Sequence, residues 1–144
     1  MRRFVIAVDF DGTIVRNRFP EIGEPVSGAI EWLQRFTTDG ASLILLTARQ
    51  GIRLSQAVDY CESNSVELWG VNKNNEQLGR PPKVYAHCYI DDLAVGVPIV
   101  RESGRKPFVD WGQVGPIVAD MMKAHKRREL AWANKRFTKY SRKS

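Results

Sequence analysis

The sequence predicts an α/β fold with a parallel sheet of about five strands and helices on both faces. Short apolar, β-branched runs of strand length alternate along the chain with segments whose apolar residues recur at helical spacing. Repeated strand–helix units of this kind favour parallel strands joined by right-handed crossovers. The runs expected as strands are Arg3–Val8, Ser42–Thr47, Val66–Val71, Val84–Ile90 and Val97–Val100.

Helices are expected between the first three of these strands and again near the C-terminus. The segment from Glu24 to Thr38 has apolar residues at helical spacing, and Pro25 suits a first helical turn. A second helix is expected around Leu54–Cys61. A third is expected to start near Asp110, which is suited to an N-cap, and to lead into the C-terminal segment.

Size and composition indicate a single compact domain. A chain of 144 residues can bury a substantial core, and its apolar residues, 43% of the total, form runs too short to span a bilayer. The first expected strand begins at Arg3, which leaves no room for a signal peptide. Cys61 and Cys88 match no metal-binding spacing, so we expect reduced thiols and a cytoplasmic protein.

The most informative motif directly follows the first expected strand and reads Asp9-Phe10-Asp11-Gly12-Thr13. Two carboxylates two residues apart point the same way if strand geometry persists, and they cannot both ionise easily at close range without a cation. Gly12 lets the backbone turn away. The motif therefore indicates a metal site in which one carboxylate attacks and its neighbour moves a proton, rather than a solvated Asp-Gly turn.

Three further polar groups lie at or beside expected strand ends. Thr47 closes the second expected strand, Lys83 precedes the fourth after two prolines, and Asp91 and Asp92 directly follow that strand. Open α/β sheets bind ligands at the carboxyl ends of their strands. We therefore expect these groups to share one site with Asp9. The alternatives are a helix-capping role for Thr47 and an exposed position for Lys83.

This order of motifs resembles the haloacid dehalogenase-like phosphohydrolase superfamily over roughly residues 3–100. The superfamily's motifs are an Asp-x-Asp-Gly-Thr segment, a strand-terminal Thr or Ser, a Lys and a strand-terminal acidic pair. The resemblance implies a Rossmann-like sheet. A small phosphatase-like subgroup of bacteria and their phages is still more similar, on the segments Ile22-Gly23, Leu46–Arg49, Trp69–Asn74 and Tyr89–Asp92.

The resemblance implies a Mg²⁺-dependent phosphomonoesterase that works through an aspartyl-phosphate. Asp9 would be the nucleophile, and Asp11 would protonate the leaving oxygen and then activate water. The Asp9 carboxylate, the Asp11 carbonyl and Asp92 would hold the metal. Asp91 would orient Lys83 or a water on the metal, although the reverse assignment of the acidic pair stays open. Thr47 would donate to a phosphoryl oxygen, and Lys83 would offset charge.

Several residues are candidates for substrate binding and not for catalysis. Arg49 follows Thr47 and could reach the substrate, or it could pair with a surface acid. Arg16 and Arg18 lie in the loop that members of the superfamily place over the active site. Asn72 follows the third expected strand and either shapes the rim of the site or serves an ordinary turn.

No cap domain is expected over the site. The intervals 14–46 and 48–82, where members of the superfamily insert caps, are already filled by expected loops, helices and a strand. We therefore expect an open site. An open site excludes water less well and admits larger substrates, including the end of a macromolecule.

Positive charge is concentrated at the C-terminal end. Residues 123–144 contain nine Lys or Arg and one Glu, a net charge of +8, which leaves −2 for residues 1–122 out of the total of +6. We therefore divide the chain into a catalytic domain, 1–122, and a basic helical extension, 123–144, that is not an independent domain. Trp132, Phe137 and Tyr140 interleave with the basic residues. This mixture suits nucleic acid, although a solvated helix end or packing on another subunit would also account for it.

Three functions follow from these observations. The leading one is a phosphatase for a small phosphorylated metabolite or nucleotide. The second is a phosphatase for nucleic-acid ends, with the basic extension binding nucleic acid. The third is a non-catalytic binding module on the same scaffold, which the intact pair of Asp9 and Asp11 disfavours. The sequence does not decide the oligomeric state.

Overall fold

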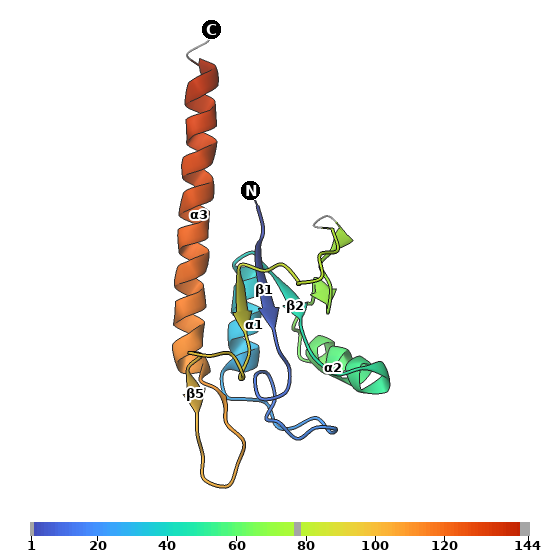
Figure 1. The fold of residues 1–144 in the computed structure, drawn as a ribbon. Coiled ribbons are helices and arrows are strands. Elements are labelled where there is room, and N and C mark those ends of the chain that lie inside the picture. The colour runs from blue at the N-terminus through green and yellow to red at the C-terminus, as the bar shows by residue number, and fades with distance from the viewer. Residues whose placement is uncertain (1, 77–78, 142–144) are drawn as a thin grey trace.

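The computed structural model describes residues 2–76 and 79–141, and its centre is a four-stranded parallel sheet (Figure 1). The strands are β1 (Phe4–Val8), β2 (Ala41–Leu45), β3 (Gly70–Val71) and β4 (Cys88–Ile90), in the order β3-β2-β1-β4. β1 and β2 pair over five residues and are buried along their whole length, as central strands must be. The predicted α/β fold with a parallel sheet is confirmed.

The fifth expected strand does not belong to this sheet. β5 (Ile99–Val100) pairs with β6 (Phe108–Val109) in antiparallel register and forms a separate hairpin. Only residues 91–98 separate β4 from β5, whereas a parallel crossover needs about a dozen residues or more. The connection is therefore too short to return the chain to the parallel sheet, and the described sheet has four strands rather than about five.

The two outer strands are shorter than their apolar runs. The expected strand Val66–Val71 pairs only at β3, and the expected strand Val84–Ile90 pairs only at β4. The ladders are extended by single hydrogen bonds, from the Trp69 amide to Leu43 and from the His87 amide to Val5. Val66 is buried without pairing, so its apolar character reflects core packing rather than strand formation.

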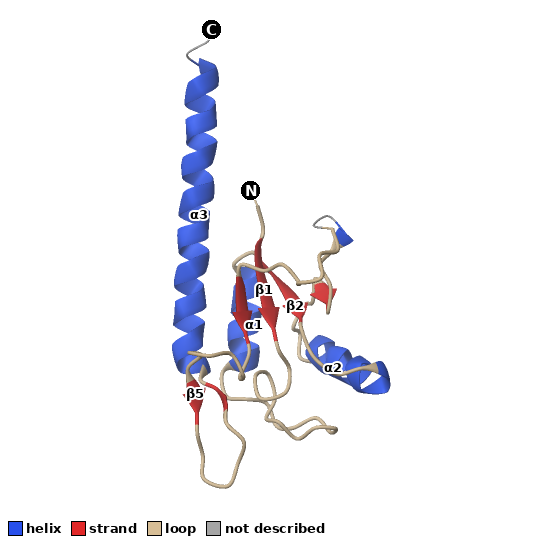
Figure 2. Cartoon of the chain, viewed as in Figure 1, coloured by secondary structure: helices blue, strands red, loops and turns tan. Residues whose placement is uncertain are grey.

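Helices α1 (Ala29–Thr38), α2 (Gly51–Ser63) and α3 (Trp111–Ser141) contribute side chains to a single hydrophobic cluster. From β1 that cluster takes Phe4, Ile6 and Val8, which share one face of the strand, whereas Val5 and Ala7 on the other face are buried outside it. Among the described residues, the buried side chains of all three helices therefore pack with the face of β1 that carries Phe4, Ile6 and Val8. We expected helices on both faces of the sheet. Figure 2 shows α1 behind the strands.

The first helix begins later than the sequence indicates. Gly28 adopts a left-handed φ of 83°, so helical geometry starts at Ala29 rather than near Glu24. Pro25 instead forms a bridge with Val15, which in turn bridges Asp11. These bridges close the segment between β1 and α1 into a loop that starts at Asp11, shortly after β1.

Residues 14–28 form only this loop. In the described part of the chain, no separate cap domain lies over the carboxyl edge of the sheet. Helix α3 begins beside the β5–β6 hairpin and runs unbroken through residue 123, the start of the expected basic extension (Figure 1). Among the described residues, no helix combines the length and the apolar character needed to cross a membrane.

The contact between α1 and α3 generates the first prediction. Gly115 lies against the Trp32 indole, and a Cβ at position 115 would overlap the ring atoms. Gly115→Ala should therefore lower the free energy of unfolding by about 1–3 kcal/mol, measured by urea denaturation. Gly112→Ala is the matched control in the same helix, because its Cβ would meet only Asp110 Oδ1, at 3.2 Å. Equal stability of the two variants would contradict the packing described.

Candidate metal and phosphate site

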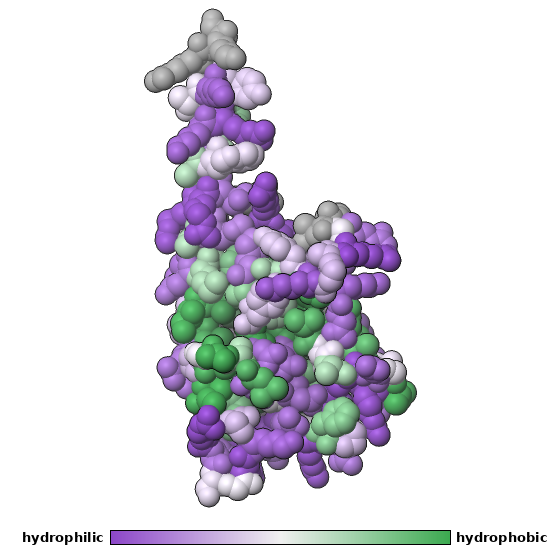
Figure 3. Space-filling view, viewed as in Figure 1, coloured by the Kyte–Doolittle hydropathy of each residue, from purple (hydrophilic) through white to green (hydrophobic). Residues whose placement is uncertain are grey.

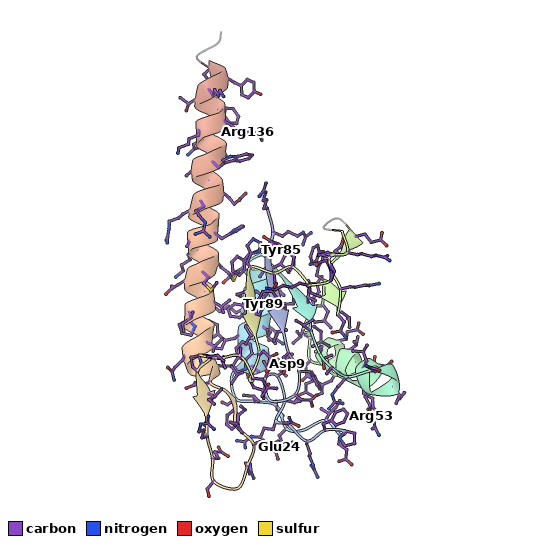
Figure 4. The ribbon with its side chains drawn as sticks, viewed as in Figure 1. Asp9, Glu24, Arg53, Tyr85, Tyr89 and Arg136 are labelled. Carbon is purple, nitrogen blue, oxygen red and sulfur yellow. The ribbon has the colours of Figure 1, made fainter. Side chains whose placement is uncertain are left out.

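Three carboxylates meet where β1 and β4 end. Asp9 directly follows β1, and Asp91 and Asp92 directly follow β4. Val8 pairs with Ile90, and the Asp9 amide donates to the Ile90 carbonyl at 2.9 Å, so the two strands end together. Each residue of the cluster offers one ligand atom, and these atoms all lie within 4.8 Å of one another. Figure 4 labels Asp9 at this edge of the sheet.

Thr13 connects the two halves of this cluster. Its buried hydroxyl donates to Asp9 Oδ2 at 3.1 Å and accepts from the Asp92 amide at 3.2 Å. Gly12 has a left-handed φ of 81°, and a Cβ at this position would overlap the Asp92 carboxylate. The Gly12-Thr13 pair is therefore required by the close approach of the loop to the end of β4. Thr13 links the carboxylates rather than capping a helix.

Burial and mutual repulsion alter the acidity of these groups. Burial raises the pKa of Asp9 to about 8, and the negative charge of Asp91 adds to the effect. Burial likewise raises the pKa of Asp92, whose carboxyl shares a hydrogen bond with Asp9. A divalent cation would relieve the same repulsion. Crowded carboxylate oxygens are the ligands that Mg²⁺ prefers, so the residues present fit that ion.

Asp11 is turned toward a different partner. Both of its carboxylate oxygens accept hydrogen bonds from Arg49, from Nε and Nη2, each at 2.7 Å. The Arg49 side chain is only 1% exposed, and it also donates to the carbonyls of Pro20 and Glu21. Arg49 is thus not a surface residue. It fastens the loop after β1 to the end of β2 through a bidentate pair.

A cavity of about 580 Å³ opens over the carboxylates. Of the residues predicted from the sequence, the structure places six along its wall: Asp9, Asp11, Thr47, Arg49, Asp91 and Asp92. The other residues that line it are Asn17, Phe19, Leu46, Ala48, Leu93 and Lys106. Residues that lie up to 97 positions apart in the sequence, Asp9 and Lys106, therefore share one open hollow.

Thr47 lies two residues after the end of β2 and forms hydrogen bonds with Asn72 and Arg49. Its amide donates to Asn72 Oδ1 at 2.8 Å, and its hydroxyl accepts from the Arg49 amide at 3.2 Å. Asn72 is therefore a support for Thr47 and is not one of the residues that line the cavity in the described structure. It has a left-handed φ of 53°, which Asn tolerates better than most residues.

The lysine expected in the site does not line the cavity in the described structure, and another lysine does. Lys83 Nζ lies 5.3 Å from the centre of the Tyr89 ring, and Lys83 is not among the described residues that line the cavity. Lys106, from the turn between β5 and β6, does line it. Sequence reasoning missed Lys106 because it lies in a charged turn with no local signal and is brought to the cavity only by the hairpin.

The two remaining predicted arginines lie beside this cavity. Arg16 forms a bidentate pair with Glu102, with contacts of 2.9 and 3.0 Å, and its guanidinium lies 4.2 Å from the centre of the Phe108 ring. It therefore ties the loop after β1 to the β5–β6 hairpin. Arg16 and Arg18 both line an adjoining hollow of about 370 Å³, which shares Asn17 and Lys106 with the first cavity.

The raised pKa of Asp9 predicts a pH-dependent stability. The folded chain holds this proton more tightly than the unfolded chain, so its stabilising effect is complete below pH 3.8 and is lost as the pH rises through about 8. Without divalent cation, Asp9→Asn should exceed the wild type in stability by a margin that grows from pH 4 to pH 8, reaching a few kcal/mol. Urea denaturation across this range measures the margin.

Two controls accompany this measurement. Asp59→Asn removes an exposed carboxylate on α2 and is the control for the loss of one negative charge. Adding Mg²⁺ at pH 8 should stabilise the wild type and leave Asp9→Asn unchanged. A margin that does not vary with pH would show that Asp9 is not held in the crowded environment described.

Comparison with known proteins gives one informative match. No family model and no curated protein matches the chain. The solved structure of a conserved protein from Bacteroides thetaiotaomicron is similar, with 34% sequence identity and a TM-score of 0.66. The match covers 83% of this chain and 93% of that one. The chain therefore belongs to the same family as this conserved Bacteroides protein.

Proposed function

We propose that this protein is a Mg²⁺-dependent phosphomonoesterase that acts through an aspartyl-phosphate on Asp9. Its substrate would be a small phosphorylated metabolite or nucleotide. The observation that supports this most is the convergence of Asp9, Asp91 and Asp92 on one open cavity that is also lined by Thr47, Arg49 and Lys106. This set combines a nucleophile, a cation site and hydrogen-bond donors for phosphoryl oxygens.

Asp9 is the nucleophile in this proposal because it belongs to the carboxylate cluster, directly follows β1 and borders the cavity. Its Oδ2 accepts the Thr13 hydrogen bond, which orients the carboxylate. Mg²⁺ held by Asp9 and Asp92, with Asp91 beside them, would neutralise the carboxylates and the phosphate. In the ionised state Asp9 attacks phosphorus, the bond to the leaving oxygen breaks, and a phosphoryl group is left on Asp9.

Asp11 is the proton donor to the leaving oxygen and, in the second step, the base that takes a proton from water. That water attacks the phosphoryl group and releases phosphate from Asp9. Arg49 donates to both oxygens of Asp11, so in this scheme Asp11 turns from Arg49 toward the leaving oxygen before it transfers a proton. An incoming phosphate offers Arg49 a second anion in the same cavity, so substrate binding and release of Asp11 are coupled in this scheme.

The remaining groups bind the phosphate. Thr47 lines the cavity, and in this scheme its hydroxyl donates to a phosphoryl oxygen. Lys106 supplies the positive charge that the sequence motif assigns to Lys83, since Lys106 lines the cavity and Lys83 lies against Tyr89. The site is open on the side where other phosphatases carry a cap, which places substrate selection on the loop after β1 and the β5–β6 hairpin.

The nucleophile and the acid make different predictions. Asp9→Asn should lower phosphate release about 10³-fold or more for every substrate, because an amide cannot attack phosphorus. Asp11→Asn should spare an activated aryl phosphate, whose leaving oxygen needs no proton, and should lower turnover of a sugar phosphate about 10²-fold. Steady-state phosphate release with excess Mg²⁺ measures both effects.

The exposed Asp59→Asn variant is the control for the loss of one carboxylate and should keep full activity. A chelator should abolish wild-type turnover, and Mg²⁺ should restore it. The proposal fails if the wild type releases no phosphate from nucleotides, sugar phosphates or aryl phosphates. It also fails if Asp9→Asn keeps more than a small fraction of the wild-type rate.

A separate prediction distinguishes the two lysines. Lys106→Ala should lower kcat/KM about 10²-fold, because a cation facing the phosphate is lost. Lys83→Ala should leave kcat/KM within about twofold, since its charge lies over the Tyr89 ring. Kinetics with an aryl phosphate at saturating Mg²⁺ provide the comparison. The reverse order of effects would return the role to Lys83, as the family resemblance implies.

A further inference from the structure

The last turns of α3 leave the body of the protein. His125 is the last buried residue of the helix, and every residue from Leu130 to Ser141 is exposed. The departing helix is fastened to the start of β1, where His125 Nε2 lies 2.9 Å from the Arg2 carbonyl and the Arg2 amide donates to Glu129 Oε2 at 3.1 Å. Beyond this point the helix projects alone (Figures 1 and 3).

The projecting part presents a basic face with an aromatic ring in its middle. Trp132 and Arg136 lie seven and eleven positions after His125, so they continue the helix face that packs on the body. Arg128 and Lys139 extend this face on either side of them. The Arg136 guanidinium lies 4.2 Å from the centre of the Trp132 ring, which is 54% exposed as a residue.

This segment has uncompensated charge. Residues 126–141 contain six Lys or Arg against Glu129 alone, and no ion pair among the described residues involves any of these six cations. A hollow of about 680 Å³ lies at the base of the projecting helix, and its wall carries Arg2, Arg35, Lys123 and Lys126 against Asp39. Positive charge therefore gathers at this end of the molecule.

The projecting part of α3 continues a packed helix, but its own residues from Leu130 to Ser141 are all exposed, so tertiary packing does not stabilise it. Like charges along it reduce its stability, because they repel one another. A polyanion would remove the repulsion. Trp132 stands between Arg128 and Arg136 at four-residue spacing, so a planar group stacked on the ring would have cations on both sides.

We propose that the basic face of α3, defined by Arg128, Trp132, Lys135, Arg136 and Lys139, binds single-stranded nucleic acid. The cations contact phosphates, and Trp132 stacks on a base. This inference does not depend on the proposed phosphatase activity. The carboxylate cluster lies at the carboxyl edge of the sheet, whereas the helix projects beyond the opposite edge (Figures 1 and 4).

The test is fluorescence anisotropy of the full chain with a labelled oligodeoxythymidine of about 20 nucleotides, titrated at several salt concentrations. Replacing Lys135, Arg136 and Lys139 together with Gln should weaken binding about tenfold or more. It should also reduce the slope of log affinity against log salt by about 2, since each phosphate contact on a single strand contributes about 0.7. Trp132→Ala should weaken binding about tenfold with the slope unchanged.

The matched control replaces Arg53, Lys73 and Arg80 with Gln, which removes the same charge from α2 and the segment after β3. This control should bind like the wild type. Circular dichroism checks that each variant keeps its helix content. The proposal is overturned if the wild type does not bind the oligonucleotide at about 50 mM salt. It is also overturned if the two triple variants lose the same amount of affinity for the oligonucleotide. Capture by anionic lipid vesicles, or self-association through α3, without oligonucleotide binding also overturns it.

Discussion

Repulsion among three carboxylates at one edge of the sheet is the constraint on which the candidate site depends. In-register pairing of β1 with β4 brings Asp9 beside Asp91 and Asp92, and burial with their negative charge raises the pKa of Asp9 to about 8. Thr13 holds the two sides together through its hydroxyl. A cluster that is unfavourable when fully ionised becomes favourable around a proton or a divalent cation, and this suits a catalytic centre more than a structural one.

The pair between Arg49 and Asp11 separates the second motif carboxylate from this cluster. A buried guanidinium needs its partners, and Arg49 finds them in Asp11 and in two carbonyls of the loop after β1. The same contacts join the end of β2 to that loop and shape one wall of the cavity. In the proposed reaction this pair is the element that must change, because the Asp11 carboxylate faces Arg49 and has to turn toward the leaving oxygen.

The carboxylate cluster and the basic part of α3 lie at opposite ends of the molecule. The cavity with the carboxylates is at the carboxyl edge of the sheet, and the basic part of α3 extends beyond the amino edge. One helix serves both ends: Trp111 and Val118 belong to the core, whereas Trp132 and Tyr140 are exposed. The phosphatase proposal and the nucleic-acid proposal therefore rest on separate residues, and either can stand without the other.

The local sequence pattern was sufficient to locate several of the strands, helices and site residues of this protein. The apolar runs located β1 and β2, helical spacing located α1 and α2, and strand-terminal polar groups located Asp9, Thr47, Asp91 and Asp92, because these signals lie within a few residues of each other. Tertiary structure alone decided the rest: the antiparallel partner of β5, the pairing of Arg49 with Asp11, and the arrival of Lys106 in place of Lys83. Each of these three features depends on the position that a loop takes in the folded chain. Packing between segments that are distant in the sequence determines that position, and the spacing of residues along the sequence does not.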